Sequence, residues 1–103
     1  MKATIFLPLV LLAVSFSGSL QAANLFAGQD RAANVCAQCH GIHKPAAGAP
    51  FPSLAGRDAA YLKEALKQYR SKKRVSEIMN AIAGSLRDND IDDLVAYYSK
   101  LKP

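Results

Sequence analysis

The sequence of 103 residues contains no tryptophan, only two cysteines and two histidines, and no internal repeat or low-complexity segment. It also has no stretch of alternating polar and apolar residues that would indicate a β-strand. The lack of a second cysteine pair argues against a structural zinc site, and the lack of strands argues against a thioredoxin-like dithiol. No group of side chains indicates a nucleophile, a general base or a convergent carboxylate pair. The side chains therefore do not predict an enzyme.

The one long apolar run lies at the N-terminus. Lys2 precedes an uncharged apolar stretch over residues 5–14, and serines with a glycine follow before Ala22 and Ala23. This order is typical of a secretory signal peptide, and the polar residues interrupt it before the roughly 20 apolar residues that a membrane-spanning helix needs. We expect cleavage after Ala22, with Ala23 as the near alternative and an uncleaved anchor as the competing interpretation. Residues 1–22 would then be removed, and residues 23–103 would form a single domain.

Apolar residues in the rest of the chain recur at helical spacing and predict an all-α domain with about four helices and one long loop. The loop is expected over residues 41–56, which contain three prolines and begin and end with glycine. A domain of this size buries a limited core, so we expect a cofactor or another staple to stabilise it. The four helices are expected over about residues 25–39, from an N-cap at Asp58 to about Ser71, from an N-cap at Ser76 to Ala83, and from Asp88 or Asp90 to about Leu101.

The strongest motif in the sequence is C-x-x-C-H, formed by residues 36–40. On a helix, side chains three and four residues apart share a face, so Cys36, Cys39 and His40 should project together. This pattern is typical of c-type haem attachment, in which two thiols bond the haem vinyl groups and the histidine ligates the iron. A structural disulfide is the remaining alternative, although its very small loop would stabilise little. We therefore predict one covalently bound haem c.

A haem iron that only transfers electrons needs a second axial ligand, and Met or His is the usual choice. Met79 is the single methionine after the expected cleavage site and lies 39 residues after His40. The other candidate is His43, which follows His40 too closely to reach the opposite face of a haem. We predict His40 and Met79 as the iron ligands, with a plain core side chain as the alternative for Met79.

With these features the chain resembles the class I cytochromes c, in particular short bacterial periplasmic domains similar to cytochromes c4, c5 and c553. The resemblance covers nearly all of residues 23–103. It rests on Gly28 with residues 32–41, on residues 52–56, on residues 61–70, on residues 74–86 and on residues 90–98. Arg87 departs from the family pattern because it stands where a small N-capping residue is common.

The resemblance implies a class I cytochrome c fold, in which the helices wrap around one haem. It implies that the carbonyl of Pro52 accepts a hydrogen bond from the histidine ligand, and that Gly28 allows the first and last helices to cross closely. The cofactor-binding residues would then be Cys36, Cys39, His40, Met79 and Pro52, and the metal ligands His40 and Met79. A one-electron carrier in the periplasm, with no enzymatic activity of its own, is the implied function.

Two other functions remain open. One is a haem c subunit of a larger dehydrogenase, for example of the flavocytochrome sulfide dehydrogenase type, and the other is a gas or redox sensor with a labile iron ligand. The expected partners are redox proteins rather than nucleic acid, with transient contacts to membrane redox complexes by a domain that is soluble after cleavage. A basic middle third predicts acidic docking surfaces on those partners, with a solvated helix face that only keeps the protein soluble as the alternative. Its basic residues are Arg57, Lys63, Lys67, Arg70, Lys72, Lys73 and Arg74.

Overall fold

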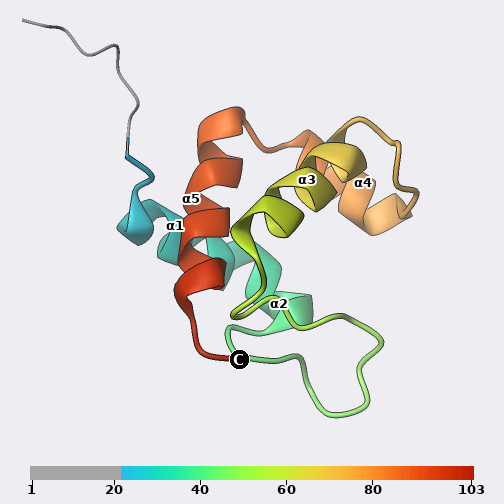
Figure 1. The fold of residues 1–103 in the computed structure, drawn as a ribbon. Helices are drawn as coiled ribbons and strands as arrows, with labels where there is room; N and C mark the ends of the chain where they lie inside the picture. The colour runs from blue at the N-terminus through green and yellow to red at the C-terminus, as the bar shows by residue number, and fades with distance from the viewer. Residues whose placement is uncertain (1–21) are drawn as a thin grey trace, which may run out of the picture.

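The structure is a computed structural model that describes residues 22–103; residues 1–21, which hold nearly all of the expected signal peptide, lie outside the described part. Within residues 22–103 the chain forms helices and loops without a strand (Figure 1). The predicted all-α class is therefore confirmed. None of the helices in this range has the length and apolar character needed to cross a bilayer. The elements are α1 (Leu25–Arg31), the π-helix η1 (Ala32–Cys36), α2 (Ala37–His40), α3 (Ala59–Arg70), α4 (Glu77–Gly84) and α5 (Asp88–Lys100).

The first predicted helix is one continuous helical segment with a π-helical stretch in its middle. In η1 the backbone N–H of Ala37 donates to the carbonyl of Ala32, five residues earlier. A π turn accommodates an additional residue and so changes the angle between the faces on either side of it. Gly28 is buried ahead of this stretch, Ala32 is buried at its first position, and His40 is buried after it. The apolar spacing of the sequence did not indicate the π stretch.

The predicted N-caps of α3 and α4 are present. The carboxylate of Asp58 accepts a hydrogen bond from the backbone N–H of Tyr61 at 2.9 Å, and the Ser76 hydroxyl accepts one from the backbone N–H of Met79 at 3.3 Å. Each bond satisfies an N–H that lacks a partner within its own helix. Helix α4 extends one residue beyond the prediction and includes Gly84.

Helix α5 begins at Asp88, and the residue at its N-cap position is Arg87. Arginine has no side-chain acceptor for the free N–H groups of the first turn. Asp90 makes the other contact of a capping box: its carboxylate accepts from the backbone N–H of Arg87 at 2.9 Å. The same carboxylate forms an ion pair with Arg31 at 3.1 Å. The hydrogen bond from the Arg87 backbone is the main cause that lowers the pKa of Asp90. The departure from the family pattern at Arg87 is thus compensated from within the helix.

Helices α1 and α5 cross in close contact (Figure 1), and Gly28 lies at the crossing. A Cβ atom at this position would lie 2.2 Å from the carbonyl oxygen of Asp93 and 3.1 Å from the Cβ atom of Tyr97. The first distance is to the backbone of the partner helix, which a side-chain rotation cannot relieve. The close crossing of the first and last helices, which the resemblance implied, is therefore present at Gly28.

We expect Gly28→Ala to lower the free energy of unfolding of the haem-bound protein by about 2–3 kcal/mol, because α1 and α5 must separate to admit the methyl group. Urea unfolding followed by far-ultraviolet circular dichroism measures this loss. Gly84→Ala is the control, because a Cβ atom there meets no atom within 4 Å. Equal stability of the Gly28→Ala variant and the wild type would contradict the close crossing.

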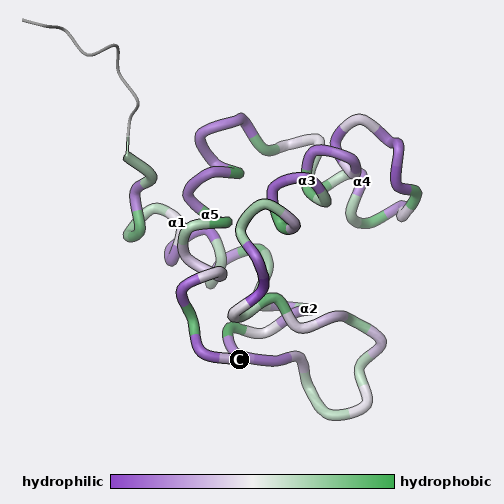
Figure 2. Tube along the Cα trace, in the orientation of Figure 1, coloured by the Kyte–Doolittle hydropathy of each residue, from purple (hydrophilic) through white to green (hydrophobic). Residues whose placement is uncertain are grey.

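The buried core is small and is formed by residues of η1, of α3, of the turn before α5 and of α5 itself. Both α3 and α5 carry hydrophilic residues beside their apolar ones (Figure 2). Five of the seven core residues also line the cavity described below. Much of the core therefore borders this cavity on one side. The seven residues are Ala32, Leu62, Leu86, Ile91, Leu94, Val95 and Tyr98.

Candidate haem site

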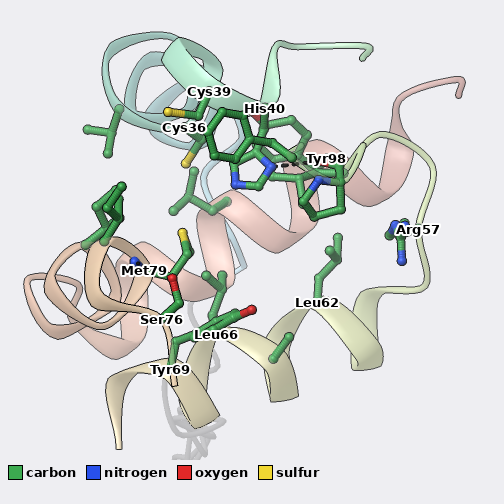
Figure 3. Close-up of a pocket in the computed structure, with 18 of the residues that line it drawn as sticks. Cys36, Cys39, His40, Arg57, Leu62, Leu66, Tyr69, Ser76, Met79 and Tyr98 are labelled. Carbon is green, nitrogen blue, oxygen red and sulfur yellow. Dashed lines mark hydrogen bonds between the residues drawn. The ribbon is translucent and has the colours of Figure 1, made fainter. Parts of the chain in front are cut away.

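A cavity of about 360 Å³ separates the segment of the C-x-x-C-H motif from α3 and α4. Most of its lining is aliphatic or aromatic, as expected for a cofactor site of this size. Figure 3 shows Cys36, Cys39 and His40 on one wall, and Met79 and Leu66 on the other. The residues that the sequence predicted for the cofactor all line this single cavity: Cys36, Cys39, His40, Pro52 and Met79.

The two cysteines and His40 reach the cavity from adjacent positions of one helical segment. Cys36 closes η1, and Cys39 and His40 form the last turn of α2. Gly41 ends the helix with a φ of 68°, which lets the chain leave the helix directly after His40. Burial raises the pKa of the Cys36 thiol to about 11. The spacing of the motif thus places two thiols and an imidazole on the same wall.

The ring of His40 is oriented by the loop that follows. Its Nδ1 atom lies 2.7 Å from the carbonyl oxygen of Pro52, and the ring of Phe51 packs edge-on at 6.0 Å between centroids. A carbonyl oxygen only accepts, so Nδ1 carries the proton. The other nitrogen, Nε2, is then unprotonated and has a lone pair for a metal ion.

The loop of residues 41–58 is attached to α5 through Tyr98. The Tyr98 hydroxyl donates to the carbonyl of Gly41 at 2.9 Å, and the backbone N–H of Gly56 donates to the carbonyl of Tyr98 at 2.8 Å. Tyr98 is buried, at 3 % exposure, and this burial is the main cause that raises the pKa of its hydroxyl. One residue of α5 therefore fixes both ends of the loop that carries Pro52.

We expect Tyr98→Phe to lower the free energy of unfolding at pH 7 by about 1 kcal/mol, because the Gly41 carbonyl loses its donor. Below pH 10 the hydroxyl is protonated in both the folded and the unfolded states. Above pH 10 the unfolded state ionises first, so the stabilisation by Tyr98 declines as the pH rises. The difference between the wild type and the variant should therefore shrink from pH 9 to pH 11. Urea unfolding across this range tests it, and a constant difference would contradict the raised pKa.

Met79 lies in the first turn of α4 and projects into the cavity from the wall opposite His40 (Figure 3). His43, the rival candidate ligand, is exposed on the loop. Its Nδ1 atom lies 3.2 Å from the carbonyl of Lys102, and it does not line the cavity. Within the described residues, no three His, Cys, Asp or Glu side chains are grouped to hold a metal ion. A methionine thioether and one imidazole are thus the candidate iron ligands in this cavity.

Sequence reasoning assigned Arg57 and Arg74 only to the basic surface. Arg57 is exposed and Arg74 is half-buried, and both also line the cavity. Their guanidinium groups lie 5.6 and 5.7 Å from the centroid of the Tyr61 ring. Arg74 also donates to the side chain of Gln68 at 2.7 Å. No sequence signal separated these two from the other basic residues, because the loop positions around them have no periodicity.

The cavity fits a covalently attached haem. Two thiols and an imidazole with a free Nε2 stand on one wall, a thioether stands on the other, and the lining between them is apolar. These are the donor types that c-type haem attachment and axial ligation require. A bound haem would also fill the space that five core residues border and would complete the core.

Comparisons with known proteins agree with this fit. Residues 23–97 match the family described as "Cytochrome C oxidase, cbb3-type, subunit III". The chain is 37% identical over 76 residues to cytochrome c-554(548) of Halomonas halodenitrificans, covering 71% of this chain and 90% of that protein. It is 43% identical over 70 residues to a thiosulfate dehydrogenase electron acceptor of Stutzerimonas stutzeri, covering 67% of this chain and 32% of that protein.

A solved cytochrome c4 structure from Acidithiobacillus ferrooxidans superposes with a TM-score of 0.69 at 30% identity, covering 82% of this chain and 54% of that one. The chain therefore spans about half of this neighbour and a third of the Stutzerimonas protein, but most of the Halomonas protein. The chain belongs to the class I c-type cytochromes and binds one haem c covalently. Its relatives support a role as an electron carrier.

Proposed function

We propose that this chain is a periplasmic one-electron carrier whose haem c is attached through Cys36 and Cys39 and ligated by His40 and Met79. The bound haem iron supplies the chemistry by alternating between the ferrous and ferric states. The observation that carries the proposal is the single cavity, which brings these four side chains together from two separate helices. If His40 and Met79 both ligate the iron, they would leave no open site on it for a substrate.

The residues of the chain then have separate tasks. The carbonyl of Pro52 accepts a hydrogen bond from Nδ1–H of His40. This bond fixes the ring and makes the imidazole a stronger ligand. The apolar wall, which includes Leu62, Leu66 and Leu94, excludes water from the iron and so favours the less charged ferrous state. We extend the proposal to the ends of the chain: residues 1–22 are a cleaved signal peptide, and residues 23–103 are the mature domain.

The basic middle third of the sequence is proposed to attract acidic redox partners, but some of its side chains already form ion pairs within the chain. Lys63 pairs with Asp92 at 2.9 Å, and Arg70 pairs with Asp88 at 2.7 Å. Lys72 and Lys73 are exposed in the connection between α3 and α4, which leads directly to the helix of Met79. These two lysines are therefore the best candidates for steering a partner toward the cavity.

We expect the double variant Lys72→Glu, Lys73→Glu to slow oxidation of the ferrous protein by the anion ferricyanide about tenfold at low ionic strength. Oxidation by the cation tris(phenanthroline)cobalt(III) should become faster. Both effects should fade above about 0.1 M salt, where the screening length is about 10 Å. Stopped-flow absorbance measures all these rates.

The control for this experiment is Lys44→Glu with Lys100→Glu, which changes the net charge equally but alters exposed lysines of the loop and of the end of α5. Equal effects of the two double variants would mean that only the total charge matters. The proposal of a localised docking surface would then be wrong.

A second function, a haem c subunit of a larger dehydrogenase, is favoured by one observation. Phe26 is 84 % exposed and Leu25 is 42 % exposed, and both border a groove with Tyr97 and Leu101. This apolar face lies on α1 and α5, on residues that do not line the haem cavity. The Stutzerimonas relative is named as an electron acceptor of thiosulfate dehydrogenase. Purification from the native organism decides between the two functions: a free carrier elutes as a small monomer, and a subunit elutes with its enzyme.

A further inference from the structure

Asn80, the residue after Met79, joins the two ends of the connection between α3 and α4. Its Nδ2 donates to the carbonyl of Tyr69 at 2.7 Å and to the carbonyl of Arg74 at 2.8 Å. Its Oδ1 accepts from the backbone N–H of Ser76 at 3.0 Å. Two carbonyls require two donors and the N–H requires an acceptor, so these partners also determine how the amide is oriented.

The three partners of Asn80 lie on either side of a strained part of the backbone. Tyr69 lies in the last turn of α3, and its carbonyl also accepts from the backbone N–H of Lys72 at 3.2 Å. The connection then passes through Lys72, which has a φ of 66°, a conformation unfavourable for residues other than glycine. Ser76 is the N-cap of α4 and accepts the backbone N–H of Met79. The side chain of Asn80 thus joins the start and the end of the connection, next to the turn that carries Met79.

Few other contacts fix the position of helix α4. It packs against α3, and Ala83 is its single buried residue. Ile78, beside Met79, is 59 % exposed. Burial of apolar surface against other parts of the chain therefore contributes little to the position of the first turn of α4. Asn80, which is itself partly buried, bonds the end of α3 at Tyr69 and the connection at Arg74. The connection is also tied to α3 by two hydrogen bonds from Arg74 to Gln68, and Asn80 is the side chain that joins both to the first turn of α4.

We infer that Asn80 is a positioning residue. Its hydrogen bonds hold the first turn of α4 in place and so keep the Met79 thioether at the wall of the haem cavity. The inference rests on the ligation by Met79 proposed above. If the three hydrogen bonds are lost, the connection and the first turn of α4 move more freely, and the thioether leaves the cavity wall for a larger fraction of the time. An external ligand binds only when the thioether is away, so its apparent affinity reports that fraction.

The test is imidazole binding to the ferric haem-bound protein, measured by absorbance titration. We expect Asn80→Ala to raise the apparent affinity about 10- to 100-fold, as loss of this number of hydrogen bonds allows. Asn80→Asp keeps an acceptor for Ser76 but points a carboxylate oxygen at the carbonyls of Tyr69 and Arg74. We therefore expect an increase at least as large, although the shape of the side chain is conserved.

Asn24→Ala is the matched control. Asn24 is the N-cap of α1, where its Oδ1 accepts the backbone N–H of Ala27 at 3.0 Å, so its loss also weakens a helix end. We expect this variant to lose stability in urea and to keep the imidazole affinity of the wild type within about twofold. An equal rise in the control would show that general destabilisation is the cause and would overturn the inference.

Met79→Ala separates the inference from the proposed function. If Met79→Ala raises the imidazole affinity but both Asn80 variants behave as the wild type, the role of Asn80 is wrong and the ligation stands. If Met79→Ala leaves the affinity unchanged, the ligation is wrong, and the role of Asn80 falls with it.

Discussion

Replacement of His40 by alanine is expected to abolish accumulation of the haem-bound protein. The variant loses the metal-binding imidazole and the donor to the carbonyl of Pro52 at once. The small core depends on the same cavity, since five of its seven residues border it. A chain of this size has little other burial to hold it folded. We expect the yield of covalent haem per cell to fall at least about tenfold, as measured by haem staining of gels.

His43→Ala is the natural control for this experiment. It removes an exposed histidine side chain three residues away, whose one hydrogen bond is to the carbonyl of Lys102. We expect a normal yield of haem-bound protein from this variant. If His40→Ala accumulates as well as His43→Ala, the imidazole of His40 is not required and its assignment as a ligand is wrong.

The second large effect is expected from Met79→Ala. Loss of the thioether should remove the sulfur-to-iron charge-transfer absorption of the ferric protein. The reduction potential should fall by on the order of 0.1 V, because methionine favours the ferrous state more than water or an added base does. The apparent affinity for cyanide or imidazole should rise at least about 100-fold, since no protein ligand then competes. Absorption spectra, redox titration and ligand titration measure these three changes.

Ile82→Ala controls for loss of volume in the same wall, because Ile82 lies one turn further along α4 and also lines the cavity. We expect this variant to keep the charge-transfer absorption with a modest loss of stability. An unchanged spectrum in Met79→Ala would show that Met79 is only a packing residue and that another group ligates the iron.

The sequence predicted the parts of the fold that depend on local chemistry. Asp58 and Ser76 are side-chain acceptors placed directly ahead of amphipathic stretches, so the starts of α3 and α4 followed from capping. The start of α5 was harder to predict, because the residue ahead of it, Arg87, has no side-chain acceptor, and the contact that fixes Arg87 comes from Asp90 within the helix. The π stretch of η1 has no local residue signature, and it went unpredicted.

The same division applies to the haem site. The spacing of Cys36, Cys39 and His40 is a local property and was sufficient to predict their common face. The contact of Pro52 with His40 joins residues 12 apart through an irregular loop, and only the resemblance to known cytochromes indicated it. Arg57 and Arg74 are polar residues on the cavity wall, and their sequence context is that of ordinary surface cations. The bonds of Asn80 depend on how a connection folds back, which no periodicity encodes.

Covalent attachment of one haem through Cys36 and Cys39 is tested most directly by acid–acetone extraction of the purified protein, followed by a pyridine haemochrome spectrum of the polypeptide. We expect the colour to stay with the denatured chain, one haem per chain, with the spectrum of a haem joined by two thioethers. Variants with Cys36→Ala or Cys39→Ala should show the shifted spectrum of a single thioether. Haem that extracts freely into the acetone from the wild-type protein would contradict covalent attachment.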